Sequence, residues 1–451
     1  MSWIAKIADR LDGVQRNFGI EALAEVLPQV WVREALADCG VRTQRRRQLP
    51  CEMTVWLVIL LALFRRHSYL NLLEMLWGGR WADAHWSGGA PPCSSALSKA
   101  RDRVGIAPVA SLYRRSASAW TEGTGSLWFW GRRVTALDGF TLKTLDSDEN
   151  RSCFGAPGAI RGASAFPQVR VVGCLDLGTR IMEAVRFGPY ATGEATLADA
   201  IRADLQSGTL MLLDRGFASY GLLWDLREQG VEFVVRVRSN MKCETIREQA
   251  PGDAVVRVSL PRPLRRKRPE LPEEWVLREV RTTTREGETM RLFTSLADPS
   301  IPATEIIDLY RRRWEEETTI DEIKTHLGCA ATVNHPLVLR SRRPDRVEQE
   351  IYGLLIGYNA ARRIMANAAG AARDPEPVSP LRVSFVAALE RIREAVRDMM
   401  RLPPCRLPER YDTLLETVAR NRVPERPGRS FPRAVRIKMS TYALNRRRHV
   451  A

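Results

Sequence analysis

Two aspartates follow strongly apolar segments, a position in which a carboxylate can do chemistry. Asp214 comes directly after the segment TLMLL and precedes Arg-Gly, and Asp138 lies within TALDGF. An acid at the edge of a buried strand needs a cationic partner or a metal ion, because an unpaired buried charge is costly. Asp138 alone also fits an ordinary turn, since Asp-Gly after a strand is a common turn signal. Asp214 is the stronger candidate, because its strand is so apolar.

A third acid comes from the segment YRRRWEEETTIDEIK, residues 310–324. Helical spacing of about 100° per residue places four of its side chains within about 60° of one another. They are Tyr310, Arg313, Glu317 and Lys324. This stripe combines an aromatic hydroxyl, two cations and one acid, which suits a phosphodiester beside a metal ion.

The same spacing separates Glu317 from the other acids of the segment. Glu315 and Glu316 fall at about 140° and 240° from Tyr310 and point elsewhere. Asp321, at about 20°, shares the face and is the reserve candidate. A surface helix with i,i+4 ion pairs is the competing interpretation, since Arg313 and Glu317 have that spacing.

Strands and helices alternate around the two aspartates, and this pattern predicts a mixed α/β sheet covered by helices. The expected strands are residues 132–140, 166–178, 181–188, 209–217 and 231–239. The expected helices between them are residues 195–205 and 220–229. A long helix over about 303–327, with Pro302 near its first turn, carries the stripe.

Changes in sequence texture divide the chain into five segments: a helical part (1–125), the first part of the α/β core (126–239), a β-rich insertion (240–289), the second part of the core (290–372) and a basic C-terminal region (373–451). In the first segment, Ser94-Ser95 offers an N-cap for a short basic helix carrying Lys99, Arg101 and Arg103, so a helix-turn-helix-like DNA reader is possible. The last segment is expected to hold a helix near 383–400 and then a Pro/Arg-rich tail.

The charge favours a polyanionic partner. The 451 residues include 69 Lys and Arg against 53 Asp and Glu, a formal net charge of +16. The excess is concentrated in three runs, at 42–47, 262–268 and 421–451. Each run alone could be a solvated loop, but three of one sign favour a nucleic-acid backbone.

Other classes are disfavoured by the sequence. The longest apolar run, residues 55–64, is about half of what a bilayer demands and predicts a buried helix. The eight cysteines lie far apart without a C-x-x-C pair, which argues against a zinc site or a disulfide framework. The N-terminal segment lacks the features of a signal peptide, so a cytoplasmic, nucleoid-associated protein is expected.

The sequence resembles the DDE-type transposases of the insertion-sequence-four family of bacterial transposons. The resemblance rests on both aspartates, in LDGF and DRGF, and on the signature Y-x2-R-x3-E-x6-K, met by Tyr310, Arg313, Glu317 and Lys324. Further similarity lies in the segments RRRQLPCEMTVWLVILLALFR, DSDENRSCFG, AFPQVRVVGCLDLGT and FPRAVRIKMSTY. The resemblance implies a ribonuclease H-like catalytic fold, with the β-rich insertion between the second aspartate and the glutamate.

Cutting a phosphodiester requires an activated nucleophile and neutralisation of the leaving 3′ oxygen. Carboxylates can hold two Mg²⁺ ions about 4 Å apart for these two tasks, and Mn²⁺ is a possible substitute. The expected ligands are Asp138, Asp214 and Glu317.

Four further residues are expected to position DNA: Tyr310, Arg313, Lys324 and Arg215. Trp275, inside the insertion, is a candidate for stacking on a flipped base, and packing in the insertion's own core is an equally good interpretation.

The resemblance implies that double-stranded DNA is the partner, as terminal inverted repeats and as target. It also implies a hairpin intermediate, joining of 3′-OH ends to target DNA, and a homodimer that bridges two ends. Two alternatives remain: an inactive DNA-binding relative that represses transposition, and a nuclease without strand transfer.

Overall fold

The computed structural model of the chain describes residues 21–42, 49–77, 92–121, 125–159, 162–163, 166–283, 287–327, 337–372 and 378–424. Two of the three basic runs, at 42–47 and 421–451, therefore lie almost entirely outside the described residues. Cys329 also lies outside them, and no disulfide joins the cysteines of the described part.

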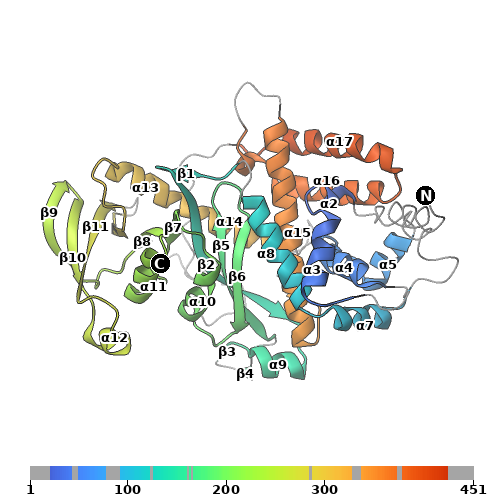
Figure 1. Ribbon diagram of the computed structural model, residues 1–451, viewed down its shortest axis with the longest axis horizontal. Helices are drawn as coiled ribbons and strands as arrows, with labels where there is room; N and C mark the ends of the chain where they lie inside the picture. Colours follow the sequence, from blue (N-terminus) through green and yellow to red (C-terminus); the bar gives the residue numbers. More distant parts are fainter. Residues whose placement is uncertain are drawn as a thin grey trace, which may run out of the picture.

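A mixed β-sheet forms the centre of the molecule (Figure 1). Its main strands are β2 (Arg132–Thr144), β5 (Gln168–Asp176), β6 (Met182–Pro189), β7 (Thr209–Leu213), β8 (Glu232–Arg236), β9 (Glu244–Ala250), β10 (Asp253–Ser259), β11 (Glu274–Thr283) and β12 (Thr289–Thr294). Two short strands, β1 (Trp128–Phe129) and β13 (Val338–Leu339), pair with β2, and a separate ribbon joins β3 (Gly158–Ala159) and β4 (Gly162–Ala163).

The order and directions of the strands confirm the ribonuclease H-like fold. The sheet runs β6-β5-β2-β7-β8 and continues through β12-β11-β10-β9. Strands β2, β7 and β8 are parallel, whereas β5 is antiparallel to both β2 and β6. The five core strands overlap the five segments that the sequence predicts.

The insertion extends this sheet. Strand β12 pairs antiparallel with β8, and β11, β10 and β9 follow in turn. A short helix, α12 (Arg262–Lys267), joins β10 to β11 and carries most of the basic run at 262–268. Residues 240–289 are β-rich as expected, but they continue the core sheet at its far edge, on the left in Figure 1.

Helices cover both faces of the sheet. On one face, α10 (Glu194–Ile201) and α11 (Tyr220–Glu228) pack with the insertion in one hydrophobic cluster. On the other face, the N-terminal and C-terminal helices share a second cluster with the sheet. These helices are α2 (Glu21–Ala24), α3 (Gln29–Asp38), α4 (Cys51–Leu63), α5 (Tyr69–Trp77), α7 (Ser94–Val104), α8 (Ala107–Thr121), α15 (Pro344–Ala371), α16 (Phe385–Met399) and α17 (Leu407–Arg420), with α9 (Asp148–Phe154) at the end of the sheet.

The apolar run at 55–64 forms the buried helix that the sequence predicts. In α4, every residue from Met53 to Leu63 is buried, and the helix packs along α15 (Figure 1). No described helix combines the length and the apolarity needed to cross a bilayer.

One expectation about the helices is wrong, and another is confirmed for the helix but not for one of its cations. Helix α17 lies where a Pro/Arg-rich tail was expected, because Pro408 stands in its first turn, where proline is tolerated. The short basic helix forms as α7, with Lys99 and Arg103 exposed. Helix α7 presents Arg101 to the interior: its side chain is 4% exposed and donates hydrogen bonds to Gln349 and Ser341. Arg101 therefore ties α7 to α15 and its preceding loop and is not available to read DNA.

Candidate active site

Asp138 and Asp214 lie side by side at the centre of the sheet. Leu137 of β2 and Leu213 of β7 are register partners in a parallel pair, so the two aspartates follow at the same level. Adjacent strands are about 4.7–4.9 Å apart, which brings the two carboxylates into one site. Each carboxylate accepts a backbone N–H from the glycine that follows it closely, Gly139 at 2.7 Å and Gly216 at 2.5 Å.

The environment of Asp138 opposes its negative charge. Burial is the main cause that raises the pKa of Asp138 to about 6, and the carboxylates of Asp214 and Glu194 add to the rise. The Gly139 amide and Arg313 act in the opposite direction. A cation placed between Asp138 and Asp214 would relieve this repulsion.

The helix that carries the signature is continuous but not uniformly α-helical. It comprises α13 (Ala303–Arg311), a 3₁₀ turn (Arg312–Trp314), α14 (Glu315–Asp321) and a π turn (Glu322–His326). The extent predicted from the sequence, about 303–327, is therefore confirmed. The assumption of one constant rotation per residue is wrong.

The 3₁₀ turn changes the directions of the side chains within it and after it. With three residues per turn it rotates about 120° per residue, so three such residues turn the following side chains about 60° further than an α-helix would. Glu316 therefore moves from about 240° to about 300° and Glu317 from about 340° to about 40°, while Arg313, two residues into the turn, moves to about 340° and lies between them. The wider π turn, closed by the Leu327 N–H to the Glu322 carbonyl at 2.7 Å, rotates less per residue and turns Lys324 back.

Glu316 and Glu317 consequently occupy different environments near Arg313. Glu316 is fully buried, and its Oε2 accepts a hydrogen bond of 3.2 Å from Arg313. Burial, followed by the neighbouring charge of Asp138, raises the pKa of Glu316 well above its ordinary value. Glu317 opens onto the same cavity as Asp138 and lies 3.7 Å from Arg313. Glu317 thus lines the cavity, as predicted, and Glu316 does not, although it lies buried beside Arg313.

A polar cavity of about 760 Å³ brings the predicted residues together. Seven of them line it: Asp138, Asp214, Arg215, Tyr310, Arg313, Glu317 and Lys324. Asp214 directly follows the end of β7, as predicted, whereas Asp138 lies in the middle of β2, which continues to Thr144. The cavity therefore joins the middle of β2 and the end of β7 to the signature helix.

Tyr310 holds the signature helix against the end of β7, and Arg313 carries a stabilised positive charge beside it. The Tyr310 hydroxyl donates a hydrogen bond of 3.2 Å to the carbonyl of Leu213, the residue before Asp214. Burial raises the pKa of Tyr310 to about 12, so the hydroxyl keeps its proton at neutral pH. Burial disfavours the charge of Arg313, but Tyr310, Glu316 and Asp138 outweigh it and raise the pKa of the guanidinium.

The remaining cations differ in exposure. Lys324 is half-buried, and burial, followed by the charge of Lys143, lowers its pKa. Among the described residues, no hydrogen bond or ion pair to the Lys324 amine is found. Arg215 is exposed at the mouth of the cavity. The Lys324 amine and the Arg215 guanidinium can each donate hydrogen bonds to a phosphate.

Sequence reasoning missed a fourth carboxylate in the cavity. Glu194, at the start of α10, pairs with Arg170 of β5 at 2.8 Å. Its carboxylate lies directly over Gly139, where a Cβ would come within 2.6 Å of the Glu194 side chain. The close approach explains why glycine follows Asp138, and no spacing rule in the sequence connects residues 139 and 194.

Trp275 does not lie in this cavity. Its side chain is 3% exposed and packs edge-on against Trp224 and Phe233 in the core beneath the insertion. This burial contradicts the prediction that its ring is available to stack on a base. The exposed aromatic in the cavity is Trp314, within the signature segment, with 45% of its surface accessible.

The donor set fits divalent metal ions of the Mg²⁺ type. All of its acidic members offer carboxylate oxygens, and Mg²⁺ is usually bound through one or two carboxylates with water and phosphate oxygens completing the shell. Within the described residues, no three His, Cys, Asp or Glu side chains are already close enough to enclose an ion. The pair Asp138 and Asp214 is therefore the part of the site that is preformed.

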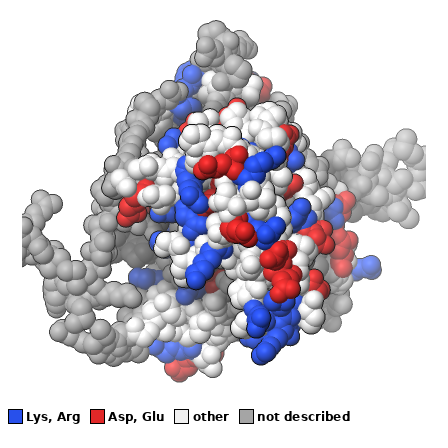
Figure 2. Space-filling view, turned by 90° about the vertical axis from the view of Figure 1, so that its left-hand side faces the viewer, with Lys and Arg blue, Asp and Glu red and all other residues white. Residues whose placement is uncertain are grey.

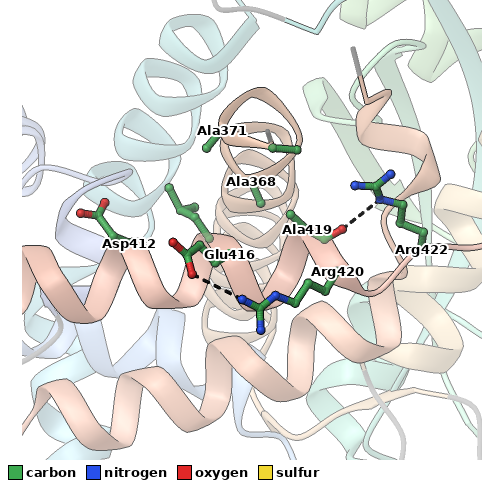
Figure 3. Close-up of a pocket in the computed structure, with 9 residues that line it drawn as sticks. Ala368, Ala371, Asp412, Glu416, Ala419, Arg420 and Arg422 are labelled. Carbon is green, nitrogen blue, oxygen red and sulfur yellow. Dashed lines mark hydrogen bonds and ion pairs between the residues drawn. The ribbon is translucent and has the colours of Figure 1, made fainter. Parts of the chain in front are cut away.

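A second cavity, of about 570 Å³, lies between α15 and α17. Figure 3 shows its floor of small side chains, such as Ala368 and Ala371, with the Glu416–Arg420 ion pair at its side. None of the residues of the signature lines it. It offers no chemistry comparable with that of the first cavity.

Comparison with known proteins agrees with this geometry. The family model described as "Transposase DDE domain" matches residues 129–360, and the model described as "Insertion element 4 transposase N-terminal" matches residues 18–114. The transposase InsG for insertion sequence element IS4 of Escherichia coli strain K12 is 30% identical over 440 residues, which cover 95% of this chain and 96% of InsG. The chain belongs to the IS4 family of DDE transposases.

Two shorter similarities point the same way. InsZ of the same strain is 30% identical over 212 residues, 47% of this chain and 68% of InsZ. The protein y4zB of Sinorhizobium fredii strain NGR234 is 31% identical over 171 residues, 34% of this chain and 42% of y4zB. Membership of the DDE transposases implies DNA as the substrate of this IS4-family chain, and DDE transposase domains generally use divalent metal ions.

Proposed function

We propose that this transposase cleaves DNA at transposon ends by two-metal hydrolysis, with Asp138, Asp214 and Glu317 as metal ligands. The observation that carries the proposal is the register of β2 and β7, which sets two carboxylates side by side in a cavity that Glu317 also lines. When bound, Mg²⁺ or Mn²⁺ ions would activate the attacking water and neutralise the leaving 3′ oxygen.

Cationic side chains of the cavity would bind phosphates of the DNA strand beside the cleaved bond. Arg313 and Lys324 project from the signature helix, and Arg215 lies at the strand end after Asp214. Together they supply positive charge on two sides of the carboxylates, as in-line positioning of a phosphodiester requires. Tyr310, bonded to the Leu213 carbonyl, would hold the helix at a fixed distance from Asp214.

The proposed reaction order has four steps. Water first breaks the phosphodiester at the transposon end and leaves a free 3′-OH. That hydroxyl attacks a phosphodiester of the opposite strand and displaces its 3′ oxygen, which releases the flanking DNA and leaves a hairpin. A second water then hydrolyses the hairpin phosphodiester and restores the 3′-OH. The restored 3′-OH then attacks a phosphodiester of target DNA and displaces its 3′ oxygen, which joins the two DNAs.

In this proposal, Trp314 is the residue that stacks on a flipped base during hairpin formation. The hairpin strains the strand end, and an aromatic ring that accepts a flipped base contributes about 1–3 kcal/mol per base. Trp314 is exposed and lines the cavity, whereas Trp275 is buried.

The five predicted segments supply the remaining roles in this proposal. Residues 1–125 would recognise the terminal inverted repeats, residues 126–239 and 290–372 form the catalytic core, and residues 240–289 the insertion. The basic region 373–451 would contact the DNA backbone and support a homodimer that bridges two ends. Helices α16 and α17 pack on α15, so the described part of this last region is joined to the catalytic core.

Labelled transposon-end DNA incubated with the protein and Mg²⁺ tests the proposal. Hairpin and joined products are expected from the wild type, and bound but uncut DNA from Asp214→Ala. Nicked DNA without joined products would favour the nuclease, and an intact bound duplex with the wild type would favour the repressor.

A further inference from the structure

The back of the signature helix is held by a buried ion cluster that the proposed chemistry does not use. Its centre is Arg180, in the turn between β5 and β6. The guanidinium donates to Glu315 from Nε at 2.6 Å and to Glu322 from Nη1 at 2.7 Å. Glu322 also accepts hydrogen bonds from Tyr358 at 2.9 Å and from Arg362.

The two acids bound by Arg180 stand at the two irregular points of the helix. Glu315 directly follows the 3₁₀ turn, and Glu322 begins the π turn. These turns rotate Glu317 and Lys324 relative to a regular helix. A single side chain therefore joins both places at which the helix departs from α geometry.

The turn that carries Arg180 is itself rigid. Asp176, fully buried, accepts hydrogen bonds from the N–H groups of Gly178 and Thr179 at 3.0 and 2.8 Å. A Cβ on Gly178 would come within 2.2 Å of the Gly125 carbonyl, so the turn packs directly against the backbone before β1. Arg180 also has a φ of 61°, a left-handed conformation that non-glycine residues rarely adopt.

Left-handed backbone at a non-glycine residue persists only where its surroundings demand it, and such residues cluster at functional sites. Here the side chain of Arg180 is 11% exposed and pairs with both Glu315 and Glu322. A buried, multiply bonded ion cluster adds little net stability but specifies one geometry. The site requires this helix to hold Glu317 and Lys324 in fixed directions.

We propose that Arg180 is a positioning residue of this transposase, which clamps Glu315 and Glu322 so that the 3₁₀ and π turns aim Glu317 and Lys324 into the cavity. The inference rests on the proposed function, because it assumes that Glu317 binds metal. Arg180 touches neither the cavity nor, by this account, the DNA. Loss of the Arg180 side chain should therefore lower the cleavage rate and raise the Mg²⁺ concentration needed for half-maximal rate, without changing the affinity for DNA.

Three variants at position 180 test the inference. Arg180→Met removes the clamp, Arg180→Gly removes it while relieving the left-handed backbone, and Arg180→Lys keeps the charge without the two-pronged guanidinium. Arg278→Met is the matched control, because Arg278 forms a buried pair with Asp253 in the insertion. Arg278 also donates to the Ile301 carbonyl before the signature helix, but among the described residues it bonds to neither the 3₁₀ turn nor the π turn. Asp214→Ala is measured in parallel as the test of the proposed function.

The measurements are thermal unfolding, DNA affinity in EDTA, and cleavage rate as a function of Mg²⁺ concentration. Residues that orient metal ligands typically change metal affinity or activity by about 10–100-fold. We expect such a loss for Arg180→Met and Arg180→Gly, a higher Mg²⁺ concentration for half-maximal rate, DNA affinity within about twofold, and partial recovery in Arg180→Lys. Arg278→Met should lose stability but keep the Mg²⁺ dependence of the wild type.

The two possible failures are distinguishable. If Asp214→Ala cuts normally, the proposed function is wrong. If Asp214→Ala is inactive but both clamp variants show the Mg²⁺ dependence of Arg278→Met, only the positioning role is wrong. Failure of both clamp variants to fold would also reject it, because the role of Arg180 would then be structural alone.

Discussion

The carboxyl group of Asp138 is held in a state that costs stability. Its pKa is raised to about 6 in the folded protein from an ordinary value of 3.8, first by burial and then by Asp214 and Glu194. The folded protein therefore holds this proton more tightly than the unfolded chain does. The group favours the fold fully below pH 3.8, and this contribution is lost as the pH rises through about 6.

Asp138→Asn is expected to make the metal-free protein more stable at pH 8, by about 2–3 kcal/mol, because the amide carries no charge to bury. Below pH 4 the advantage should vanish. Urea unfolding in EDTA at both pH values measures the difference, and Mg²⁺ should stabilise the wild type but not the variant. A variant less stable than the wild type at pH 8 would contradict this account.

Glu316 and Glu317 are adjacent glutamates, and replacing each with glutamine allows their effects on cleavage to be compared. Burial raises the pKa of Glu316 well above its ordinary range, which favours the neutral form. Glu316 is also absent from the cavity lining, so Glu316→Gln should leave cleavage within a few-fold of the wild type. Glu317→Gln removes a metal ligand and should lower the cleavage rate by about 10³-fold, the equivalent of several kcal/mol. Rates at saturating DNA and Mg²⁺ decide between them.

The reserve candidate Asp321 serves as control for that pair. Its carboxylate is largely exposed and pairs with His326 at 3.3 Å, so Asp321→Ala should cut normally. An inactive Asp321→Ala beside an active Glu317→Gln would show that the wrong acid was chosen.

At the scale of elements, the sequence was sufficient for the strands and the extent of the signature helix. Apolar segments ending in aspartate mark β2 and β7, because both strands are buried on two faces. The 3₁₀ and π turns could not be predicted, since they accompany contacts to Arg180, more than 130 residues away along the chain. For the same reason Arg101 looked like a DNA-binding residue: its partner Gln349 lies 248 residues further on.

The exposed ring of the signature segment gives a prediction for this element. Trp314→Ala should leave the first nick nearly unchanged and reduce hairpin formation by about 5–100-fold, which corresponds to the loss of about 1–3 kcal/mol of stacking. Trp275→Phe, in the buried core, should not change the ratio of hairpin to nick. Quantifying both products on denaturing gels tests the pair, and an equal loss at both steps with Trp314→Ala would reject a stacking role.

At the scale of the whole molecule, one side of the described part carries positive charge interspersed with acids (Figure 2). Figure 2 shows this mixture on the side of the molecule that carries the insertion. On α12, Arg265 and Arg268 are paired with Glu273 and with Asp225. The net charge of the chain thus overstates what the described surface offers to DNA.

The exposed cations of α12 are the part of that surface available to phosphates. Arg262, Arg266 and Lys267 are exposed, and no ion pair to them is found among the described residues. Replacing all three with alanine should weaken DNA binding and reduce the slope of log K against log salt by up to about 2.7, at about 0.9 per phosphate contact. An unchanged salt slope would show that α12 does not contact the DNA backbone.

The most direct test of the central claim is to locate the metal. Crystals of the protein with transposon-end DNA and Mn²⁺ would show the ions by their anomalous scattering. We expect at least one ion between the carboxylates of Asp138 and Asp214, about 2.0–2.3 Å from their oxygens, with Glu317 in the same cluster. Ions bound elsewhere, or a cavity in which Glu317 turns away from both aspartates, would contradict it.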